Sequence, residues 1–186
     1  RAAQARKAMA RVSRYWDWQP RSRPELYYEY FNGTALTHHL YGLRVSLDML
    51  HEEGMEQVWA RHETLAQAIW AACDAWSSGG DLRLNVMDPA HRSRAVTAAA
   101  LTAPDATRLR QWLSERAGVT LGIGLGMAPP GDPACDGFFR FGHMGHVNAH
   151  MVLGMLSSVQ AGMAALGIAY GAGGIDAATA IVAHRA

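Results

Sequence analysis

The chain has 186 residues, of which 49% are apolar and 18% are charged, and its formal net charge is +1. A chain of this length buries about two thirds of its unfolded surface, which is enough for one compact domain, or for one domain with part of another. The composition excludes an intrinsically disordered chain, and the balanced charge gives no indication of nucleic-acid binding.

The first elements along the chain are predicted to be a helix and an irregular connection. Residues 1–12 are rich in alanine and in basic residues, which favours a helix. They lack interleaved aromatic residues and a strong apolar stripe, so the basic side chains are expected on a solvated helix face. Residues 14–24 hold Tyr, Trp and Pro and predict an irregular aromatic connection.

Two long helices are predicted to follow directly on one another. Leucines recur at steps of three and four over residues 36–50, which predicts one continuous apolar helix face that ends near Gly54. Thr34 is a candidate cap for this helix. A second helix is expected over residues 55–76, stopped by the Ser-Ser-Gly-Gly run that comes after it.

The rest of the chain predicts a small α+β domain with helices on one face of a sheet. Its cysteines, Cys73 and Cys135, match no metal spacing and are expected to be free thiols in a reducing compartment. The most apolar stretch, residues 147–170, is interrupted by glycine, serine and glutamine, so we expect no membrane span and a cytoplasmic protein. The expected elements are strands at 82–86 and 95–101, a helix at 105–117, strands at 119–125 and 138–141, and helices at 147–166 and 175–184.

The segment around Arg140 is the most informative part of the sequence. Arg140 stands between Phe139 and Phe141 on a predicted strand that stops at Gly142, which places a guanidinium near a strand end. A guanidinium fork matches a carboxylate in a two-point contact. The residues alone leave two interpretations open, a structural ion pair and a site for the carboxylate of a ligand.

Three histidines follow and suggest a metal site, but their pattern does not support one. His146 and His150 are four residues apart at the start of a predicted helix, with His143 just before them. The metalloprotease pattern needs a glutamate after the first histidine, and this position is Val147. Capping, turn and surface roles are therefore expected for the histidines, and no metal ligand.

Two other segments suggest phosphate binding and have simpler explanations. Gly122, Gly124 and Gly126 alternate, but Met127 replaces the last glycine of a dinucleotide-binding pattern, so tight turns and close backbone packing are expected. Thr34 could offer a hydroxyl and backbone N–H groups at a helix N-terminus, which is a natural phosphate site. A plain helix cap explains the same residue.

In this order, the segments resemble class V aminotransferases, in particular the alanine:glyoxylate and serine:glyoxylate group. The resemblance runs from about Val12 to the Gly-Ala-Gly-Gly run at 171–174, and its most specific parts are Arg-Phe-Gly-His-Met-Gly at 140–145 and Tyr-Gly-Leu-Arg at 41–44. The other matching pieces are Tyr-Trp-Asp-Trp at 15–18, Thr34, Glu-Glu-Gly at 52–54, Arg-His at 61–62, Val-Thr-Ala at 96–98 and the glycines at 122–126.

The resemblance implies an α/β fold of the type I pyridoxal-phosphate transferases, in a protein about twice as long that forms a homodimer. This chain would be its C-terminal portion, which comprises the end of the large domain and the small α+β domain with an antiparallel sheet covered by helices. The implied division is 1–35 for the tail of the large cofactor domain and its connection, 36–78 for interdomain helices and 79–186 for the small domain.

The resemblance also implies roles for single residues. Arg140 matches the arginine that holds the substrate α-carboxylate, and Thr34 matches the threonine that reaches the cofactor phosphate of the neighbouring subunit. The family's phosphate-contacting tyrosine corresponds to Phe31, so Tyr30 is its possible replacement. Lys7 is the single lysine and falls after the position of the Schiff-base lysine. The chain therefore lacks a catalytic residue for the cofactor linkage.

The activity implied for the full-length protein is transamination between alanine or serine and a 2-oxo acid such as glyoxylate or pyruvate, with pyridoxal 5'-phosphate as cofactor. Two alternatives stay open at this point. One is a class V lyase or desulfurase, which would use an active-site cysteine. The other is a non-catalytic truncated domain that dimerises or binds a partner.

Overall fold

The computed structural model describes residues 1–13, 15–31 and 33–185, the last without its side chain. The chain divides into two compact units, unit 1 (Arg1–Glu53) and unit 2 (Gly54–Ala186). The boundary at Gly54 places the first long helix in unit 1 and the second in unit 2. The three-part division implied by the family resemblance stays a prediction.

Unit 1 is made of short helices and one long helix. Helix α1 (Ala2–Ala8) is shorter than the predicted helix at 1–12. It is followed by α2 (Gln19–Ser22) and the 3-10 turn η1 (Tyr27–Tyr30). The long helix α3 (Thr37–Glu53) has no buried residue, and its leucine-bearing face is exposed.

Thr34 does not cap α3, which corrects the sequence-based expectation. The helix begins at Thr37, and the first carbonyl that accepts a helical hydrogen bond is that of Leu36, from the amide of Leu40. Thr34 lies in an exposed bend further upstream. The N-cap position of α3 is thus Leu36, an apolar residue whose side chain cannot accept a hydrogen bond.

The second long helix, α4 (Met55–Ser77), starts where the sequence predicted. Gly54 has φ +82°, a left-handed conformation that glycine adopts without steric cost, and this ends α3. Unlike α3, α4 buries one face in unit 2. Its buried residues are Val58, Leu65, Ala66, Ala68, Ile69, Trp70, Ala72, Cys73 and Trp76.

The sheet of unit 2 is antiparallel, and each predicted strand is present, three of them in shorter form and the last one residue longer. Its strands are β1 (Arg83–Leu84), β2 (Val96–Ala100), β3 (Gly122–Ile123) and β4 (Phe138–Gly142). Their spatial order is β1-β2-β4-β3, so the last strand lies in the interior and β3 is an edge. Arg140 of β4 is in register with Ala98 of β2 and with Gly122 of β3.

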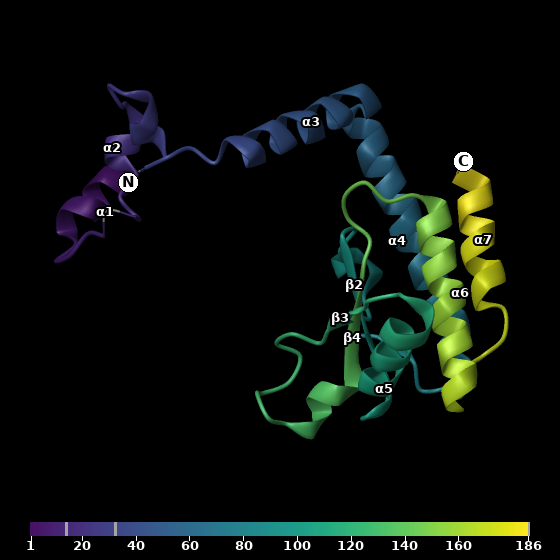
Figure 1. The fold of residues 1–186 in the computed structure, drawn as a ribbon. Helices are drawn as coiled ribbons and strands as arrows, with labels where there is room; N and C mark the ends of the chain where they lie inside the picture. The colour runs from purple at the N-terminus through teal and green to yellow at the C-terminus, as the bar shows by residue number, and fades with distance from the viewer. Residues whose placement is uncertain (14, 32, 186) are drawn as a thin grey trace. The chain divides into compact units, whose positions relative to one another are not determined.

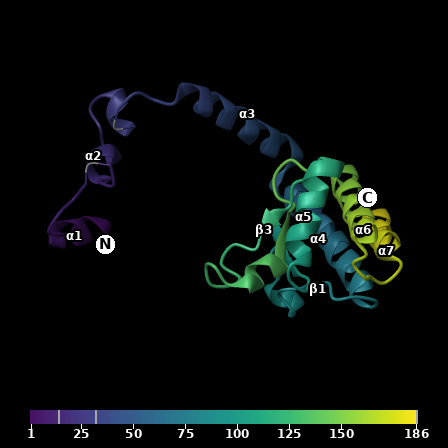
Figure 2. The same ribbon diagram turned by 60° about the horizontal axis from the view of Figure 1, so that its bottom comes forward.

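Helices cover one side of this sheet (Figure 1 and Figure 2). Helix α5 (Asp105–Trp112) continues into a π-helical turn, η3 (Leu113–Ala117), and two helices close the chain, α6 (Ala149–Leu166) and α7 (Gly174–Arg185). Helix α7 packs mainly on α4, while α6 contacts α4, α5 and α7. The predicted fold class, an α+β domain with an antiparallel sheet under helices, is confirmed.

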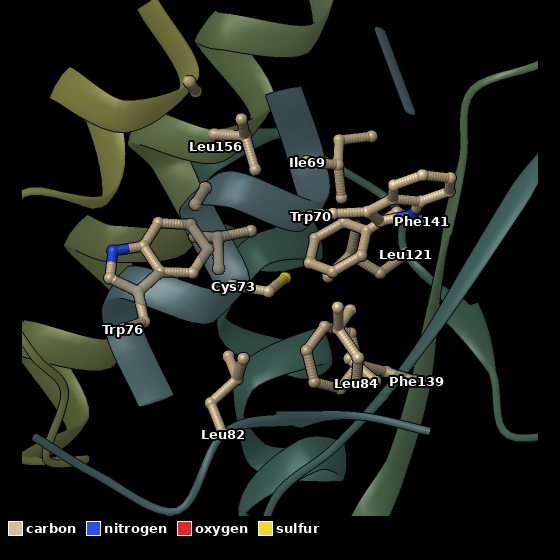
Figure 3. Packing of buried hydrophobic residues seen from close by; sticks show 14 of the residues in the cluster. Ile69, Trp70, Cys73, Trp76, Leu82, Leu84, Leu121, Phe139, Phe141 and Leu156 are labelled. Atoms are coloured by element: carbon tan, nitrogen blue, oxygen red, sulfur yellow. The ribbon is translucent and has the colours of Figure 1, made fainter. Parts of the chain in front are cut away.

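The core of unit 2 lies between the sheet and these helices (Figure 3). The rings of Phe139 and Phe141 are fully buried, with centroids 5.1 Å apart and an edge-on arrangement. Cys73 of α4 lies within the same cluster, and burial raises the pKa of its thiol. Trp76 anchors the far end of the core, where its Nε1 donates to Oε1 of Gln160 on α6 at 3.0 Å.

Helix α6 is, among the described residues, the one helix long and apolar enough by length and composition to cross a membrane. One of its faces nevertheless belongs to the core of unit 2, where Val152, Leu156, Val159 and Met163 are buried. Packing of this face accounts for much of its apolar composition.

Candidate functional site

The alternation of β4 places Arg140 on the sheet face away from the core. Phe139 and Phe141 point into the core and are fully buried, so the side chain between them must emerge on the other face. The long helices α4, α6 and α7 lie on the core side of the sheet (Figure 1). The expectation that the Phe-Arg-Phe pattern places this guanidinium at a strand end rather than on an outer face is therefore wrong, because Arg140 is the middle residue of β4 and lies on the outer face of the sheet.

The guanidinium of Arg140 is held by the backbone of the neighbouring strand. Its Nε donates a hydrogen bond to the carbonyl oxygen of Ile123 at 2.7 Å. Among residues 1–13, 15–31 and 33–185, no Asp or Glu forms an ion pair with Arg140. The structural ion pair left open by the sequence is thus absent from the described part of the chain.

The alternating glycines are packing residues, as the sequence predicted. A Cβ atom at Gly122 would lie 3.3 Å from both Cβ and Nε of Arg140, and one at Gly124 would overlap Cβ of Phe138. Gly126 has φ +75° in the turn that leaves β3. Gly122 and Gly124 let the backbone of β3 approach β4 closely.

The strand that carries Arg140 leads into a buried polar network. His143 is fully buried, and its Nε2 lies 2.9 Å from Oγ1 of Thr97 on β2. The same hydroxyl oxygen accepts a hydrogen bond from Nε1 of Trp70 at 2.9 Å. The network ties β2, the end of β4 and α4 together, three residues along the chain from Arg140.

His143 is neutral at physiological pH because of where it lies. Loss of hydration on burial lowers its pKa to about 4; the backbone of Arg94 opposes this shift, and nearby His62 adds to it. The contact with the Arg94 backbone is too poorly aligned to count as a hydrogen bond to Nδ1 by geometry. The sequence-based expectation of a capping, turn or surface role for His143 is therefore wrong, since the ring is a core group.

The loop after β4 is fastened to α4 by two adjacent side chains. Nη1 of Arg61 donates to the carbonyl oxygens of Gly145 and Val147, at 3.0 and 2.8 Å. The amide of Gly145 donates to Nε2 of His62 at 3.1 Å, so Nδ1 of that ring carries the proton and donates to the carbonyl of Val58 at 2.7 Å. The Arg-His pair of the sequence thus positions the loop.

The three histidines weighed as metal ligands do not come together. His146 and His150 are exposed, whereas His143 is buried. No group of three potential metal ligands occurs among the described residues. Helix α6 is capped by Asn148, whose side chain accepts from the amide of Met151 at 3.0 Å, so neither exposed histidine is the cap.

The residues that the resemblance assigns to the cofactor all lie in unit 1. Thr34, Tyr30 and Phe31 are exposed there, and Asn32 lies outside the described residues. Lys7 is exposed on α1, as predicted for a lysine that does not serve the cofactor. Arg140 belongs to unit 2.

Sequence reasoning missed one ion pair in unit 1. Asp17 is almost fully buried and accepts hydrogen bonds from Nε and Nη2 of Arg6, at 2.8 and 2.6 Å. This contact lowers the pKa of the Asp17 carboxyl. Both residues line an open hollow of about 670 Å³ with Trp16 and Trp18 on its wall. No local pattern links a helix residue to an aspartate eleven positions later, so only the aspartate between two tryptophans gave a signal.

Two curated relatives of this chain are both serine–glyoxylate aminotransferases. The chain is 30% identical over 161 residues to a serine–glyoxylate aminotransferase of Arabidopsis thaliana, covering 86% of this chain and 38% of the relative. A serine–glyoxylate aminotransferase of Methylorubrum extorquens is 33% identical over 155 residues, covering 82% and 35%. The chain thus spans well under half the length of the curated relatives that it matches.

Solved structures agree with this result. Pyridoxamine-pyruvate aminotransferase of Mesorhizobium loti superposes with a TM-score of 0.74 at 30% identity, over 91% of this chain and 41% of its own. Ureidoglycine-glyoxylate aminotransferase of Bacillus subtilis gives a TM-score of 0.76 over 96% and 44%, and at 23% identity it supports the fold. The family model described as Aminotransferase class-V matches residues 13–141, a segment that includes Arg140. The chain belongs to the class-V aminotransferase family.

Proposed function

We propose that the full-length protein transfers an amino group from alanine or serine to a 2-oxo acid such as glyoxylate or pyruvate, and that Arg140 holds the carboxylate of these substrates. The observation that carries the proposal is the guanidinium of Arg140, which is half-buried on the sheet face away from the core and has no carboxylate partner in the described residues. The names of the serine–glyoxylate and pyridoxamine-pyruvate relatives support this substrate class.

Membership of the family implies pyridoxal phosphate as the cofactor of the full-length protein. The described residues of this chain do not fit its covalent linkage, because Lys7 is the single lysine and is exposed on α1. The cofactor supplies the electron sink for the amino-group exchange. The contribution of this chain is therefore to bind and orient the substrate, and the resemblance assigns the lysine to a part of the protein outside it.

Arg140 suits the orienting role for a chemical reason. A guanidinium binds a carboxylate through two parallel N–H bonds, which fixes the direction of the substrate as well as its position. Correct orientation of the reacting bond contributes a large share of catalysis in such reactions. Hydrogen bonds to a charged group are worth roughly 1.5 to 3 kcal/mol, so the loss of this contact is measurable.

The partners and the location are part of the same proposal. Thr34, exposed before α3, would reach the cofactor phosphate of a neighbouring subunit in a homodimer, with Tyr30 in place of the tyrosine that Phe31 replaces. We propose a cytoplasmic enzyme without a nucleic-acid or membrane partner. The size of the protein in solution and fractionation of the cell test these points.

The test is substitution of Arg140 in the full-length protein. Arg140→Ala should lower kcat/KM for alanine or serine by roughly 30-fold to 1000-fold, the equivalent of about 2 to 4 kcal/mol. Arg140→Lys should rescue poorly, because an ammonium keeps the charge but lacks the planar fork. Arg83→Ala is the matched control, since Arg83 is an exposed arginine on β1 of the same sheet.

Turnover of a simple amine without a carboxylate shows whether Arg140 binds the substrate carboxylate or only supports the structure. This substrate should be affected much less than alanine, while the cofactor spectrum stays unchanged. Equal losses on both substrates would mean that Arg140 is a structural residue. Near-normal transamination by a folded, cofactor-loaded Arg140→Ala variant would refute the proposal.

The lyase or desulfurase alternative needs a reactive cysteine, and the described thiols do not favour it. Cys73 is fully buried and its pKa is raised by burial, which opposes formation of a thiolate. Cys135 lies in the 3-10 turn η4 (Pro133–Gly137), and its Sγ donates to the carbonyl of Pro129 at 3.2 Å. The non-catalytic alternative is tested by the same kinetics, because a binding domain would show no turnover in the full-length protein.

A further inference from the structure

The hydrogen bond between Arg140 and Ile123 determines which donors of the guanidinium remain available. A guanidinium has five N–H donors, one on Nε and two on each Nη. A carboxylate can bind across Nε and one Nη, or end-on across both Nη atoms. Nε of Arg140 already donates to the carbonyl of Ile123 at 2.7 Å. A carboxylate therefore cannot bind across Nε and one Nη, and the end-on arrangement remains.

The carbonyl of Ile123 is itself held in place. It accepts a second hydrogen bond, from the amide of Leu125 at 2.9 Å, across a three-residue turn at the end of β3. A carbonyl oxygen has two lone pairs, so these two bonds satisfy it. The turn therefore directs the oxygen of Ile123 at the Arg140 side chain and keeps it there.

Gly122 leaves the space that the guanidinium needs. It lies opposite Arg140 in the β3–β4 register, and a Cβ atom at this position would come within 3.3 Å of Cβ and of Nε of Arg140. A methyl group at position 122 would displace the Arg140 side chain by a few tenths of an ångström. A larger group there would fill the space that the guanidinium occupies. Gly122 is not in the left-handed region, so this space is its one structural requirement.

We propose that the Gly122–Ile123 backbone is a positioning element that fixes the guanidinium of Arg140 so that the substrate carboxylate docks end-on, on Nη1 and Nη2. The inference rests on the proposed function, in which Arg140 binds that carboxylate. In this proposal the edge strand β3 sets the direction in which the Arg140 guanidinium points. It can do so because Gly122 has no side chain to fill that space. Ile123 acts through its carbonyl, so its side chain is free to vary.

The first measurement tests the position of the side chain without any substrate. In the chain labelled with ¹⁵N-arginine, the Nε–H of Arg140, assigned by its loss in Arg140→Lys, should exchange with water roughly tenfold more slowly than that of the exposed Arg83, because it is hydrogen-bonded. Gly122→Ala should reduce this protection and Gly122→Val should abolish it. Gly154→Ala is the matched control, since a Cβ at Gly154 on α6 meets nothing within 4 Å.

The second measurement is the affinity of the full-length protein for sodium pyruvate. The Kd should rise about 5-fold in Gly122→Ala and about 50-fold in Gly122→Val, because small displacements of an orienting group are costly, and should stay constant in Gly154→Ala. Thermal unfolding of each variant checks that the fold persists. The Gly122→Ala variant keeps the test decisive if Gly122→Val does not fold.

The outcomes separate this inference from the proposed function. Loss of both protection and affinity in the Gly122 variants supports the positioning element. Lost protection with unchanged affinity, or an unprotected Nε–H in the unmodified chain, overturns it while leaving Arg140 as the carboxylate ligand. Pyruvate binding that is the same in Arg140→Ala as in the unmodified protein overturns the proposed function, and the end-on docking with it.

Discussion

Helices α3 and α4 follow one another in the chain and have similar apolar patterns, yet they are in opposite environments. Both carry apolar residues at steps of three and four, and Gly54 alone separates them. Nine residues of α4 are buried in unit 2, and none of α3 is buried. Leu65 of α4 is 2% exposed, whereas Leu43 of α3 is 54% exposed.

The difference shows what a periodic sequence pattern determines. It determines that a helix forms and which of its faces is apolar, but the surface that covers this face lies elsewhere in the sequence. For α4 that surface is the sheet with α6 and α7, all within this chain. For α3 the described residues supply none, so its leucines are exposed.

The sharpest test compares the same substitution on both helices. Leu65→Ala should destabilise unit 2 by about 2 to 5 kcal/mol, because it removes a core side chain and leaves a cavity. Leu43→Ala should change stability by less than about 0.5 kcal/mol in the isolated chain. Urea unfolding followed by tryptophan fluorescence, which reports on buried Trp76, measures both. Similar losses in the two variants would contradict the difference in burial.

A pH titration should destabilise unit 2 through His143. The pKa of His143 falls to about 4 in the folded chain from an ordinary value of 6.5, so folding favours the neutral ring. Stability should therefore be constant above about pH 6.5 and fall by up to roughly 3 kcal/mol as the pH drops to about 4. The measurement is the urea midpoint against pH, compared with His143→Gln, which cannot titrate. Parallel curves for the two proteins would exclude His143 as the cause.

The exposed face of α3 should make the isolated chain associate. Leu36, Leu40, Leu43 and Leu47 are 38% to 68% exposed, and Trp16 and Trp18 of unit 1 are also largely exposed. Replacing the four leucines by glutamine should lower both dye binding and the apparent mass in sedimentation. The same four changes should leave the α4 core intact. A monodisperse monomer at high concentration that binds no hydrophobic dye would refute this prediction.

The smallest effect is expected at Lys7. This lysine is exposed on α1, and no enclosed site surrounds it to stabilise a Schiff base. Pyridoxal phosphate followed by borohydride should therefore label Lys7 slowly and without saturation, as it labels an ordinary surface amine. Peptide mass mapping gives the stoichiometry. Specific, stoichiometric labelling at low cofactor concentration would show that unit 1 holds a cofactor site after all.

The elements of unit 2 could be predicted from sequence because their signals are local. Gly54 sets the break between the long helices, and the Phe-Arg-Phe alternation sets the two faces of β4. Strand β3 is shorter than the expected 119–125, because Gly122 and Gly124 pack against β4 and the backbone then turns. Helix α1 ends at Ala8 and α3 begins at Thr37, since helix ends depend on caps that are weak at both places.

The role of Arg140 stays a prediction, and the surroundings of this residue could not be predicted from sequence. The Phe-Arg-Phe alternation fixes only that Arg140 lies on the opposite sheet face from Phe139 and Phe141. The roles of His143 and Asp17 depend on Thr97 and Arg6, which lie 46 and 11 residues away. The hydrogen bond from Arg140 to Ile123 depends on strand register, which a sequence pattern fixes only when the whole sheet is known.

Burial of Cys73 makes the native chain behave as a protein with a single accessible thiol. Cys135 is half-exposed in the loop before β4, whereas Cys73 lies inside the core with a raised pKa. A maleimide should therefore attach one dye at Cys135, next to the strand that carries Arg140, without any cysteine having to be removed. Modification of Cys73 requires the core to open. The rate of this modification therefore measures how often unit 2 opens in the native state.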